Sequence, residues 1–262
     1  MKPLQNLLPF PFSLIATDMD GTLTCEGRFD VALLRALTAL RSAGIPVVIV
    51  TGRSAGWVSG LAHYLPVTGA IAENGGVFFQ DGRTDYLVEI GALVEHRRAL
   101  AEMFWMLRDR FPQIRESSDN AFRQTDWTFD VTGLGTEELL LMAQMCEIAG
   151  WGFTYSTVQC HIMHRKQNKA LGLKQVLEMV FPQVGLDSVV TVGDSPNDES
   201  LFTFTHSVGV ANVKHYVDQL AQLPSYVTEA CEGEGFCELV AHLLGYEDVP
   251  NSGDRKSYGI LY

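Results

Sequence analysis

The chain has 262 residues, of which 47% are hydrophobic, and it carries a formal net charge of −12. This length and composition suffice for one large domain, or for a core and a smaller second unit, with a sizeable hydrophobic interior. The negative charge argues against nucleic-acid and anionic-membrane partners, because both require a positively charged surface. It does not argue against a phosphate ester, since a metal ion and a few local cations can overcome the global charge.

The cysteines and the apolar runs bear on the compartment. The five cysteines are irregularly spaced and form no CxxC motif, which favours reduced thiols over a disulfide framework or a zinc site. The first residues contain one lysine and the early prolines Pro9 and Pro11 but no small-residue cleavage site, so they do not resemble a signal peptide. No apolar run approaches the roughly 20 residues of a membrane span. We therefore expect a cytoplasmic protein; the sequence does not indicate its oligomeric state.

The first predicted element is a buried strand that ends at two aspartates. The apolar run from Phe12 to Ala16 is followed by Asp18 and Asp20, and Gly21 then allows the backbone to turn. Residues i and i+2 of a strand point the same way, so the two carboxylates project together, roughly 6–7 Å apart. Two such charges repel each other unless a cation lies between them or one is protonated, and Mg²⁺ is the natural cation.

An alternation of helices and strands follows. An amphipathic helix is expected from Asp30, its N-cap, to Ser42, with an apolar face formed by Val31, Leu34, Leu37 and Leu40. The β-branched run Ile45–Val50 predicts a strand buried on both faces, and a helix to Leu65 and a short strand over Ala70–Ala72 come next. These units predict a parallel sheet, with ligands bound beyond the carboxyl ends of its strands.

The pattern changes between residues 84 and 164. Helices are expected over Gly91–Phe111 and Thr136–Ile148, a strand over Ala121–Thr132, and a strand pair or one bent strand over Phe153–His164. We therefore predict an α/β protein in which residues 1–83 and 165–262 form a Rossmann-like core and residues 84–164 an inserted α+β unit. Most aromatic side chains of the insert are expected in its own core.

The alternation then resumes. The expected elements are a helix over Asn168–Val180, strands over Ser188–Val192, Ser207–Val210 and Tyr226–Thr228, a helix that opens at Ala211, and a last segment over Glu238–Leu244. The polar tail from Glu247 to Tyr262 is expected to be poorly ordered, although Tyr258–Tyr262 could pack back onto the core.

Polar residues gather at the predicted strand ends. Asp18 and Asp20 follow one strand and Thr51 another, Lys169 opens a helix, and Asp194 and Asp198 follow a fourth element. Several acids in one crevice require a cation, and the metal in turn needs an anionic ligand, most commonly phosphate. The Lys169 ammonium can hold a carboxylate and a phosphate together, while Thr51 and backbone N–H groups can donate to phosphate oxygens.

This ordered set of motifs resembles the haloacid dehalogenase superfamily. The segments are DMDGT at Asp18, the strand that leads into TGR at Thr51, the lysine that opens a helix, and GDSPND at Asp194, and together they span nearly the whole chain. The insert between the second and third motifs is similar to the C2 cap of the Cof-like, class IIB members, as is ENGG at Glu73–Gly76. That subgroup includes phosphatases of sucrose phosphate, trehalose phosphate and mannosyl-3-phosphoglycerate.

The resemblance implies a role for each motif residue. Asp18 would be the nucleophile that forms an aspartyl-phosphate, and Asp20 the acid and base that protonates the leaving alcohol and then activates water. The Mg²⁺ ligands would be Asp18, Asp20 through its backbone carbonyl, and Asp194, with Asp198 either a further ligand or hydrogen-bonded to the ligands. The substrate-binding residues would be Thr51, Gly52, Arg53, Asn74, Lys169 and Asn197. An aspartate at position 20 argues against dehalogenation, because the dehalogenases of the superfamily lack this second acid.

Alternatives remain at the level of residues and of function. Lys166 is a rival for the phosphate-binding lysine, although Leu173 and Leu177 follow Lys169 at helical spacing. Arg53 could equally form a structural salt bridge, and Asn74 a turn. We expect a Mg²⁺-dependent phosphatase of a small metabolite, a sugar or polyol phosphate, selected by the cap. A phosphomutase and a non-catalytic phosphosugar-binding module are the alternatives.

Overall fold

The computed structural model describes residues 1–8, 11–156 and 158–246, and its larger sheet has nine strands. Their order is β1-β12-β11-β10-β2-β3-β4-β5-β6. The bounds are β1 Lys2–Pro3, β2 Leu14–Thr17, β3 Val47–Val50, β4 Gly69–Ala72, β5 Val77–Gln80, β6 Arg83–Tyr86, β10 Val189–Gly193, β11 His206–Gly209 and β12 Tyr226–Val227. In this order, every neighbouring pair from β1 to β4 is parallel, whereas β5 pairs antiparallel with both β4 and β6. The predicted parallel α/β core is therefore confirmed.

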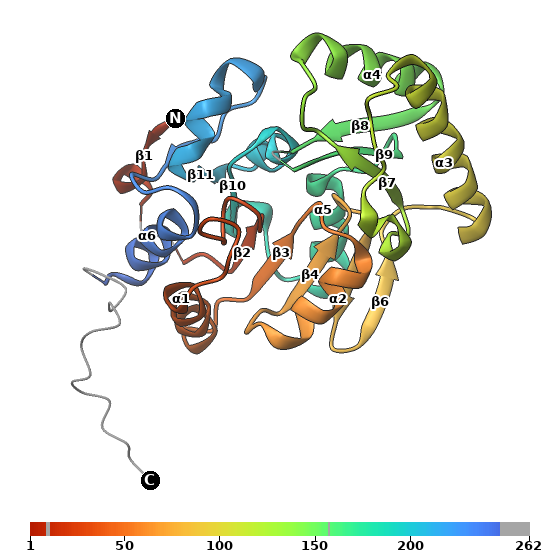
Figure 1. The fold of residues 1–262 in the computed structure, drawn as a ribbon. Coiled ribbons are helices and arrows are strands. Elements are labelled where there is room, and N and C mark those ends of the chain that lie inside the picture. Colours follow the sequence, from red (N-terminus) through yellow and green to blue (C-terminus); the bar gives the residue numbers. More distant parts are fainter. Residues whose placement is uncertain (9–10, 157, 247–262) are drawn as a thin grey trace.

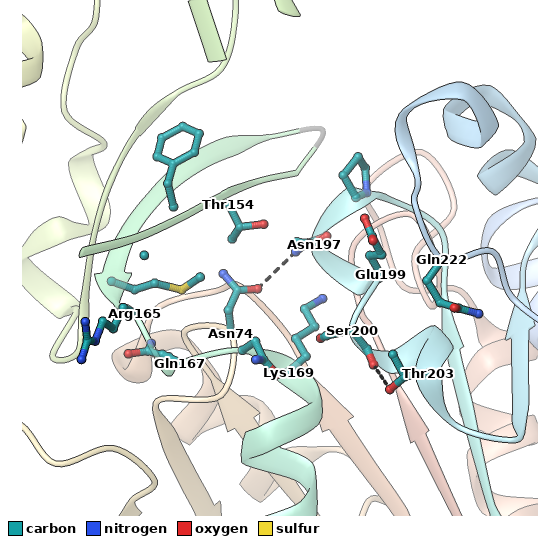
Figure 2. Close-up of a pocket in the computed structure, with 15 residues that line it drawn as sticks. Asn74, Thr154, Arg165, Gln167, Lys169, Asn197, Glu199, Ser200, Thr203 and Gln222 are labelled. Carbon is teal, nitrogen blue, oxygen red and sulfur yellow. Dashed lines mark hydrogen bonds between the residues drawn. The ribbon is translucent and has the colours of Figure 1, made fainter. Parts of the chain in front are cut away.

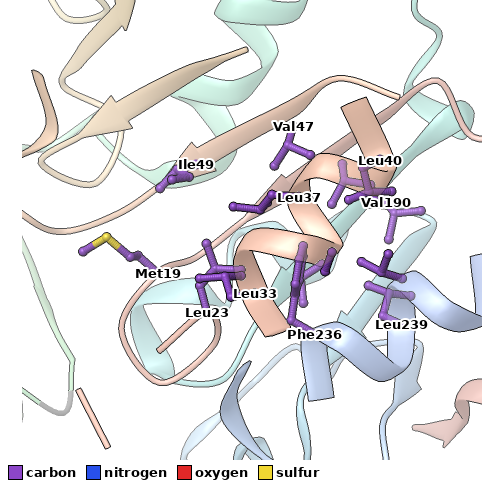
Figure 3. Close-up of a cluster of buried hydrophobic side chains, with 14 of the residues drawn as sticks. Met19, Leu23, Leu33, Leu37, Leu40, Val47, Ile49, Val190, Phe236 and Leu239 are labelled. Carbon is purple, nitrogen blue, oxygen red and sulfur yellow. The ribbon is translucent and has the colours of Figure 1, made fainter. Parts of the chain in front are cut away.

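Helices cover both faces of this sheet (Figure 1). The side chains of α1 (Val31–Ser42), α2 (Ala55–Tyr64) and α6 (Glu232–Leu244) pack in one hydrophobic cluster with one face of the strands, whereas α5 (Lys169–Val180) packs on the opposite face. Figure 3 shows Leu33, Leu37 and Leu40 of α1 next to Phe236 and Leu239 of α6. Strands that are apolar on both faces, as predicted for Ile45–Val50, are what a sheet between two helical layers requires.

The predicted apolar face of α1 is wrong in part. Asp30 caps the helix as expected, because its carboxylate accepts a hydrogen bond from the Leu33 backbone N–H at 2.8 Å. The buried stripe, however, consists of Leu33, Ala36, Leu37 and Leu40, whereas Val31 and Leu34 are 59% and 43% exposed. A stripe through positions 33, 36, 37 and 40 follows the 3.6-residue period, and it leaves Val31 and Leu34 beyond its edge.

A second, antiparallel sheet lies over the carboxyl ends of the core strands (Figure 1). Its order is β7-β9-β8, with β7 at Asp126–Asp130, β8 at Trp151–Tyr155 and β9 at Gln159–His164. The helices α3 (Leu93–Arg110) and α4 (Thr136–Ile148) pack against it around a separate hydrophobic cluster that includes Phe104 and Phe129. We call this second sheet with α3 and α4 the cap.

Several elements differ from those expected. The strand predicted over Ala121–Thr132 begins only at Asp126, because Ser118–Phe122 forms a 3₁₀ helix. The segment that opens at Ala211 is also a 3₁₀ helix, and α6 begins six residues before the predicted segment. The hairpin of β5 and β6 has no counterpart in the prediction. Its strand β6 belongs to the large sheet, so a boundary between residues 83 and 84 falls inside a core strand, and the division into core and insert stays a proposal.

The tail from Glu247 to Tyr262, including Tyr258–Tyr262, lies outside the described residues. Among the residues that are described, no helix is both long and apolar enough to cross a bilayer.

Candidate functional site

Four neighbouring parallel strands place three of the predicted site residues together with Glu73. β10, β2, β3 and β4 lie side by side, and Asp194, Asp18, Thr51 and Glu73 respectively follow their last residues. All four side chains are almost fully buried. The carboxyl ends of adjacent parallel strands form one edge of a sheet, so residues distant in sequence converge there.

Lys169 connects the first and last of the aspartate motifs. Its Nζ donates to Asp18 Oδ1 at 2.5 Å and to Asp198 Oδ1 at 2.6 Å, and the side chain is fully buried. Asn168 caps α5 by accepting from the Leu171 N–H at 2.9 Å, which places Lys169 in the first turn, directed at the strand ends. Lys166, the alternative in the sequence, is exposed. Lys169 is thus the lysine that contacts Asp18.

Asp18, Asp194 and Asp198 form a compact group of buried carboxylates. One oxygen from each lies within 4.8 Å of the others. Asp194 accepts hydrogen bonds from Thr22 Oγ1 at 3.0 Å and from Asn212 Nδ2 at 2.8 Å. Asp198 accepts at Oδ2 from the backbone N–H groups of Asp194 and Ser195. These bonds fix the orientation of the carboxylates before any ion binds.

The electrostatics of this group favour cation binding. Burial, followed by the charge of Asp198, raises the pKa of Asp18 to about 7, even though Lys169 acts in the opposite direction. Burial and the neighbouring aspartates likewise raise the pKa of Asp194 well above its usual range. Three acids share one lysine, so the site has an excess of negative charge that a divalent cation would neutralise. Buried carboxylate oxygens are ligands of the hard type that Mg²⁺ prefers, and the donor set therefore fits such an ion.

Asp20 lies apart from these three carboxylates and is bound by Arg53. The guanidinium donates from Nε to Oδ2 at 2.8 Å and from the second terminal nitrogen to Oδ1 at 2.6 Å. This bidentate ion pair holds the Asp20 carboxylate beside a cavity at the carboxyl ends of the core strands. The side chain of Asp20 is therefore not one of the clustered metal-ligand candidates in the described residues, and its predicted contribution through the backbone carbonyl stays a prediction.

Two asparagines complete the core side of the site. Asn197 Nδ2 donates to Asn74 Oδ1 at 3.3 Å, and the Nδ2 of buried Asn74 has no partner within the described part of the chain. Asn74 follows Glu73 with φ of +52° in the turn after β4. In the same turn, a Cβ on Gly75 would be 2.2 Å from the carbonyl oxygen of Asn168, which lies between β9 and α5. The ENGG segment thus brings an unpaired amide donor to the strand ends.

Glu73 itself, to which the prediction assigned no role, connects core and cap. Its carboxylate accepts from the Ala55 N–H at the start of α2, from the Gln124 and Thr125 N–H groups, and from Thr125 Oγ1 at 2.7 Å. Burial is the main reason that the pKa of Glu73 is raised to about 7. The ENGG segment is therefore also an anchor for the cap.

The cap contributes residues that sequence reasoning did not identify as functional. The buried Arg123 donates to the Gly52 carbonyl oxygen at 3.0 Å, to Asp126 at 2.9 Å and to Gln159 Oε1 at 2.8 Å. His161 Nδ1 lies 2.8 Å from Asp126 Oδ2. These contacts depend on how the cap sheet lies on the core, which no local pattern in the sequence specifies.

Two cavities meet at this junction. The smaller has about 20 Å³ of free volume and is lined from the core by Asp18, Asp20, Thr51, Gly52, Arg53, Ser195 and Asn197, and from the cap by Ser156, Val158, Gln159 and His161. The larger, of about 330 Å³, reaches Lys169, Asn74 and Asn197 from the side of β8 (Figure 2). Asn197 lines both cavities. Asp18 and Asp20, the two residues expected to carry the chemistry, line the smaller cavity, and the cap closely covers it.

Comparison with known proteins agrees with this architecture. The family model for haloacid dehalogenase-like hydrolases matches residues 15–95 and 142–237. Phosphoglycolate phosphatase 1 of Saccharolobus solfataricus is 29% identical over 243 residues, which cover 88% of this chain and 95% of the relative. A phosphoglycolate phosphatase of Halorubrum lacusprofundi is 32% identical over 215 residues, covering 76% of this chain and 84% of that protein.

Solved structures share the fold. A Thermoplasma acidophilum protein superposes with a TM-score of 0.73 at 22% identity, covering 90% of this chain and 99% of that one. The sucrose-phosphatase of Synechocystis, solved with sucrose and phosphate, has a TM-score of 0.67 at 16% identity and covers 89% and 98%. The family match, the relatives and the converging motifs together show that this chain belongs to the haloacid dehalogenase-like hydrolases and is an enzyme of their phosphatase type.

Proposed function

We propose that the protein is a Mg²⁺-dependent phosphatase that hydrolyses a small phosphorylated metabolite through an aspartyl-phosphate on Asp18. The observation that carries this proposal is the buried contact of Lys169 with both Asp18 and Asp198, next to a third carboxylate. A lysine held against a carboxylate at the end of a strand orients that carboxylate and offers positive charge to a phosphoryl group beside it.

In the first half of the reaction, an Asp18 oxygen attacks phosphorus and the bond from phosphorus to the ester oxygen breaks. The departing alkoxide takes a proton from Asp20, and the alcohol leaves. Lys169, the Thr51 hydroxyl and the unpaired Asn74 amide would donate to the phosphoryl oxygens. The divalent ion, held by Asp18, Asp194 and Asp198, would neutralise the charge of the phosphoryl group.

In the second half, water attacks the phosphorus of the aspartyl-phosphate, and Asp20 accepts the proton of that water. The acyl-phosphate bond breaks, inorganic phosphate leaves and the Asp18 carboxylate is restored. Asp20 must carry a proton before the first half, yet Arg53 now binds both of its oxygens. An anionic substrate that draws the Arg53 guanidinium toward itself would release Asp20 for this role.

The substrate that we favour is a short sugar or polyol phosphate. The solved relatives include a sucrose-phosphatase, and the curated relatives are named phosphoglycolate phosphatase. The cap covers Asp18 and Asp20 closely, which supports a small phosphate ester rather than a phosphorylated macromolecule. Phosphoglycolate is the rival substrate, and a panel of phosphorylated metabolites assayed with the purified protein would separate the two classes.

The direct test is hydrolysis of p-nitrophenyl phosphate by the full chain. We expect turnover with Mg²⁺, none with EDTA, recovery when Mg²⁺ is added back, and a loss of at least about 1,000-fold in Asp18→Asn, because the amide cannot act as the nucleophile. If the wild-type protein hydrolyses no phosphate ester in the presence of Mg²⁺, the proposal is wrong. A requirement for a bisphosphate activator would indicate the phosphomutase instead.

A further inference from the structure

His161 occupies a position in the cap that the proposed mechanism does not use. It lies on β9, the central strand of the cap sheet, opposite Thr128 of β7 and Thr154 of β8, and its side chain is 1% exposed. The ring lies directly against the loop after β3, since a Cβ built on Gly52 would be 3.1 Å from His161 Cε1 and 3.2 Å from Nε2. A glycine at position 52 therefore allows a cap residue to reach the phosphate-binding loop.

The environment fixes which nitrogen of His161 carries a proton. Nδ1 faces Asp126 Oδ2 at 2.8 Å, and this carboxylate also accepts from Arg123 Nη1 at Oδ1 and Oδ2, at 3.0 and 2.9 Å. Asp126 remains an acceptor, because the charge of Arg123 and the bond from His161 outweigh its burial and lower its pKa. Nδ1 therefore donates to Asp126, and in the neutral ring Nε2 carries the lone pair.

The Nε2 end has no hydrogen-bond partner among the described residues, and His161 lines the small cavity together with Asp18, Asp20 and Arg53. Burial lowers the pKa of His161 and the charges of Arg123 and Lys169 add to this, which outweighs the opposite effect of Asp126 and favours the neutral ring. The cap thus presents one oriented acceptor to a cavity whose core side contains cations and acids.

We propose that His161 is a specificity residue whose Nε2 accepts a hydrogen bond from a hydroxyl group of the leaving alcohol. Asp126 is its positioning residue, and Arg123 ties this pair to the Gly52 carbonyl oxygen, so the acceptor reaches the substrate only when the cap covers the core. This inference rests on the proposed phosphatase function and narrows its substrate class to phosphate esters with a second hydroxyl close to the ester. A buried acceptor left unpaired discriminates against an analogue that lacks the hydroxyl.

The test compares two esters of equal chain length, glycerol 3-phosphate and propyl phosphate. We expect the wild-type protein with Mg²⁺ to prefer glycerol 3-phosphate by about 10-fold or more in kcat/KM. In His161→Phe, which keeps a ring against Gly52 but has no acceptor, the preference should fall to about 1, while the inhibition constant of inorganic phosphate changes less than about 2-fold. His164→Phe, on the same strand but outside the small cavity, is the matched control and should keep the preference.

Asp126→Asn provides a second variant that keeps the imidazole. Its amide can still accept from Arg123 while donating to Nδ1, which moves the ring proton to Nε2 and should also abolish the preference. A wild-type ratio near 1, or a preference that survives in both variants, would overturn the inference while the phosphatase assignment stands. A His161-dependent preference for phosphoglycolate over ethyl phosphate would overturn it too, because His161 would then donate to a carboxylate. Failure to hydrolyse these esters while p-nitrophenyl phosphate is turned over would overturn the inference alone, whereas failure on p-nitrophenyl phosphate as well would contradict the proposed function itself.

Discussion

At the scale of single residues, the decisive contact is the buried ammonium of Lys169 between Asp18 and Asp198. Removing one partner of a buried ion pair destabilises a protein by more than the intact pair stabilises it, because the remaining charge stays buried without a partner. Here two carboxylates would lose their cation at once, beside Asp194.

Lys169→Met should therefore reduce the free energy of unfolding of the metal-free protein by about 3–5 kcal/mol. It should also lower the rate of p-nitrophenyl phosphate hydrolysis by at least about 100-fold, since charge opposite the phosphoryl group is lost. Urea titration and steady-state assays measure the two effects. Lys166→Met is the matched control, because Lys166 is exposed, and it should change stability by less than about 0.5 kcal/mol. Equal effects of the two substitutions would contradict the assignment of Lys169 as the lysine that pairs with Asp18 and Asp198.

The residues that the sequence predicts well are those at the ends of parallel strands. Asp18, Thr51 and Asp194 follow apolar runs, and the topology of a parallel sheet alone brings such positions together. The ion-pair partner of Arg53, which the sequence analysis named only as a substrate-binding or salt-bridge candidate, and the place of His161 were beyond this reasoning. Their partners, Asp20 and Asp126, come from other segments, and both pairings depend on side-chain direction and on how the cap lies on the core.

At the scale of elements, the turn after β4 connects the core to the cap through hydrogen bonds to both. The Glu73 carboxylate accepts hydrogen bonds from three backbone N–H groups and the Thr125 hydroxyl. These donors belong to α2 and to the segment before β7. A carboxylate satisfies such a set, whereas an amide would direct its own N–H₂ group at one of these donors.

Glu73→Gln should consequently lower the free energy of unfolding at pH 8 by about 1–3 kcal/mol, the cost of leaving a buried donor unsatisfied. Chemical denaturation measures this change. Glu89→Gln, at an exposed position, is the control and should stay within about 0.5 kcal/mol of the wild-type value. A Glu73 variant as stable as this control would mean that the carboxylate does not hold core and cap together.

The bounds of helices could be predicted where local sequence signals define them, but the buried face of a helix and the pairing of short strands could not, because tertiary packing determines both. The bounds of α1 and α5 were nearly correct because Asp30 and Asn168 cap them by side-chain bonds that the sequence signals. The buried stripe of α1 and the hairpin of β5 and β6 were not identified. The side of a helix that is buried and the pairing of short strands depend on tertiary neighbours.

At the scale of the whole molecule, the buried acids should make stability depend on pH and metal together. The pKa values of Asp18 and Glu73 are raised from 3.8 and 4.5 to about 7, and that of Asp194 is raised as well. Between about pH 4 and pH 7 these three carboxyls therefore bind more protons in the folded protein than in the unfolded chain, whereas His96 and His161, whose pKa values are lowered, oppose this only near pH 6. By linkage, the free energy of unfolding falls as the pH rises through this range.

We expect the Tm in EDTA to decrease from pH 5 to pH 8, and Mg²⁺ to raise it more at pH 8, where the carboxylates are ionised and bind the ion better. Differential scanning calorimetry at the two pH values, with EDTA or Mg²⁺, measures both effects. A Tm in EDTA that rises from pH 5 to pH 8, or a larger effect of Mg²⁺ at pH 5, would contradict this account of the buried acids.

The most direct test of the central claim is to identify the residue that carries the phosphoryl group. Enzyme quenched during turnover of a phosphate ester with Mg²⁺ is treated with borohydride, which reduces an aspartyl-phosphate to homoserine, and the peptides are analysed by mass spectrometry. We predict conversion at Asp18 alone, absent without substrate or with EDTA. Conversion at another aspartate, or rapid turnover with Asp18 unmodified, would contradict the account.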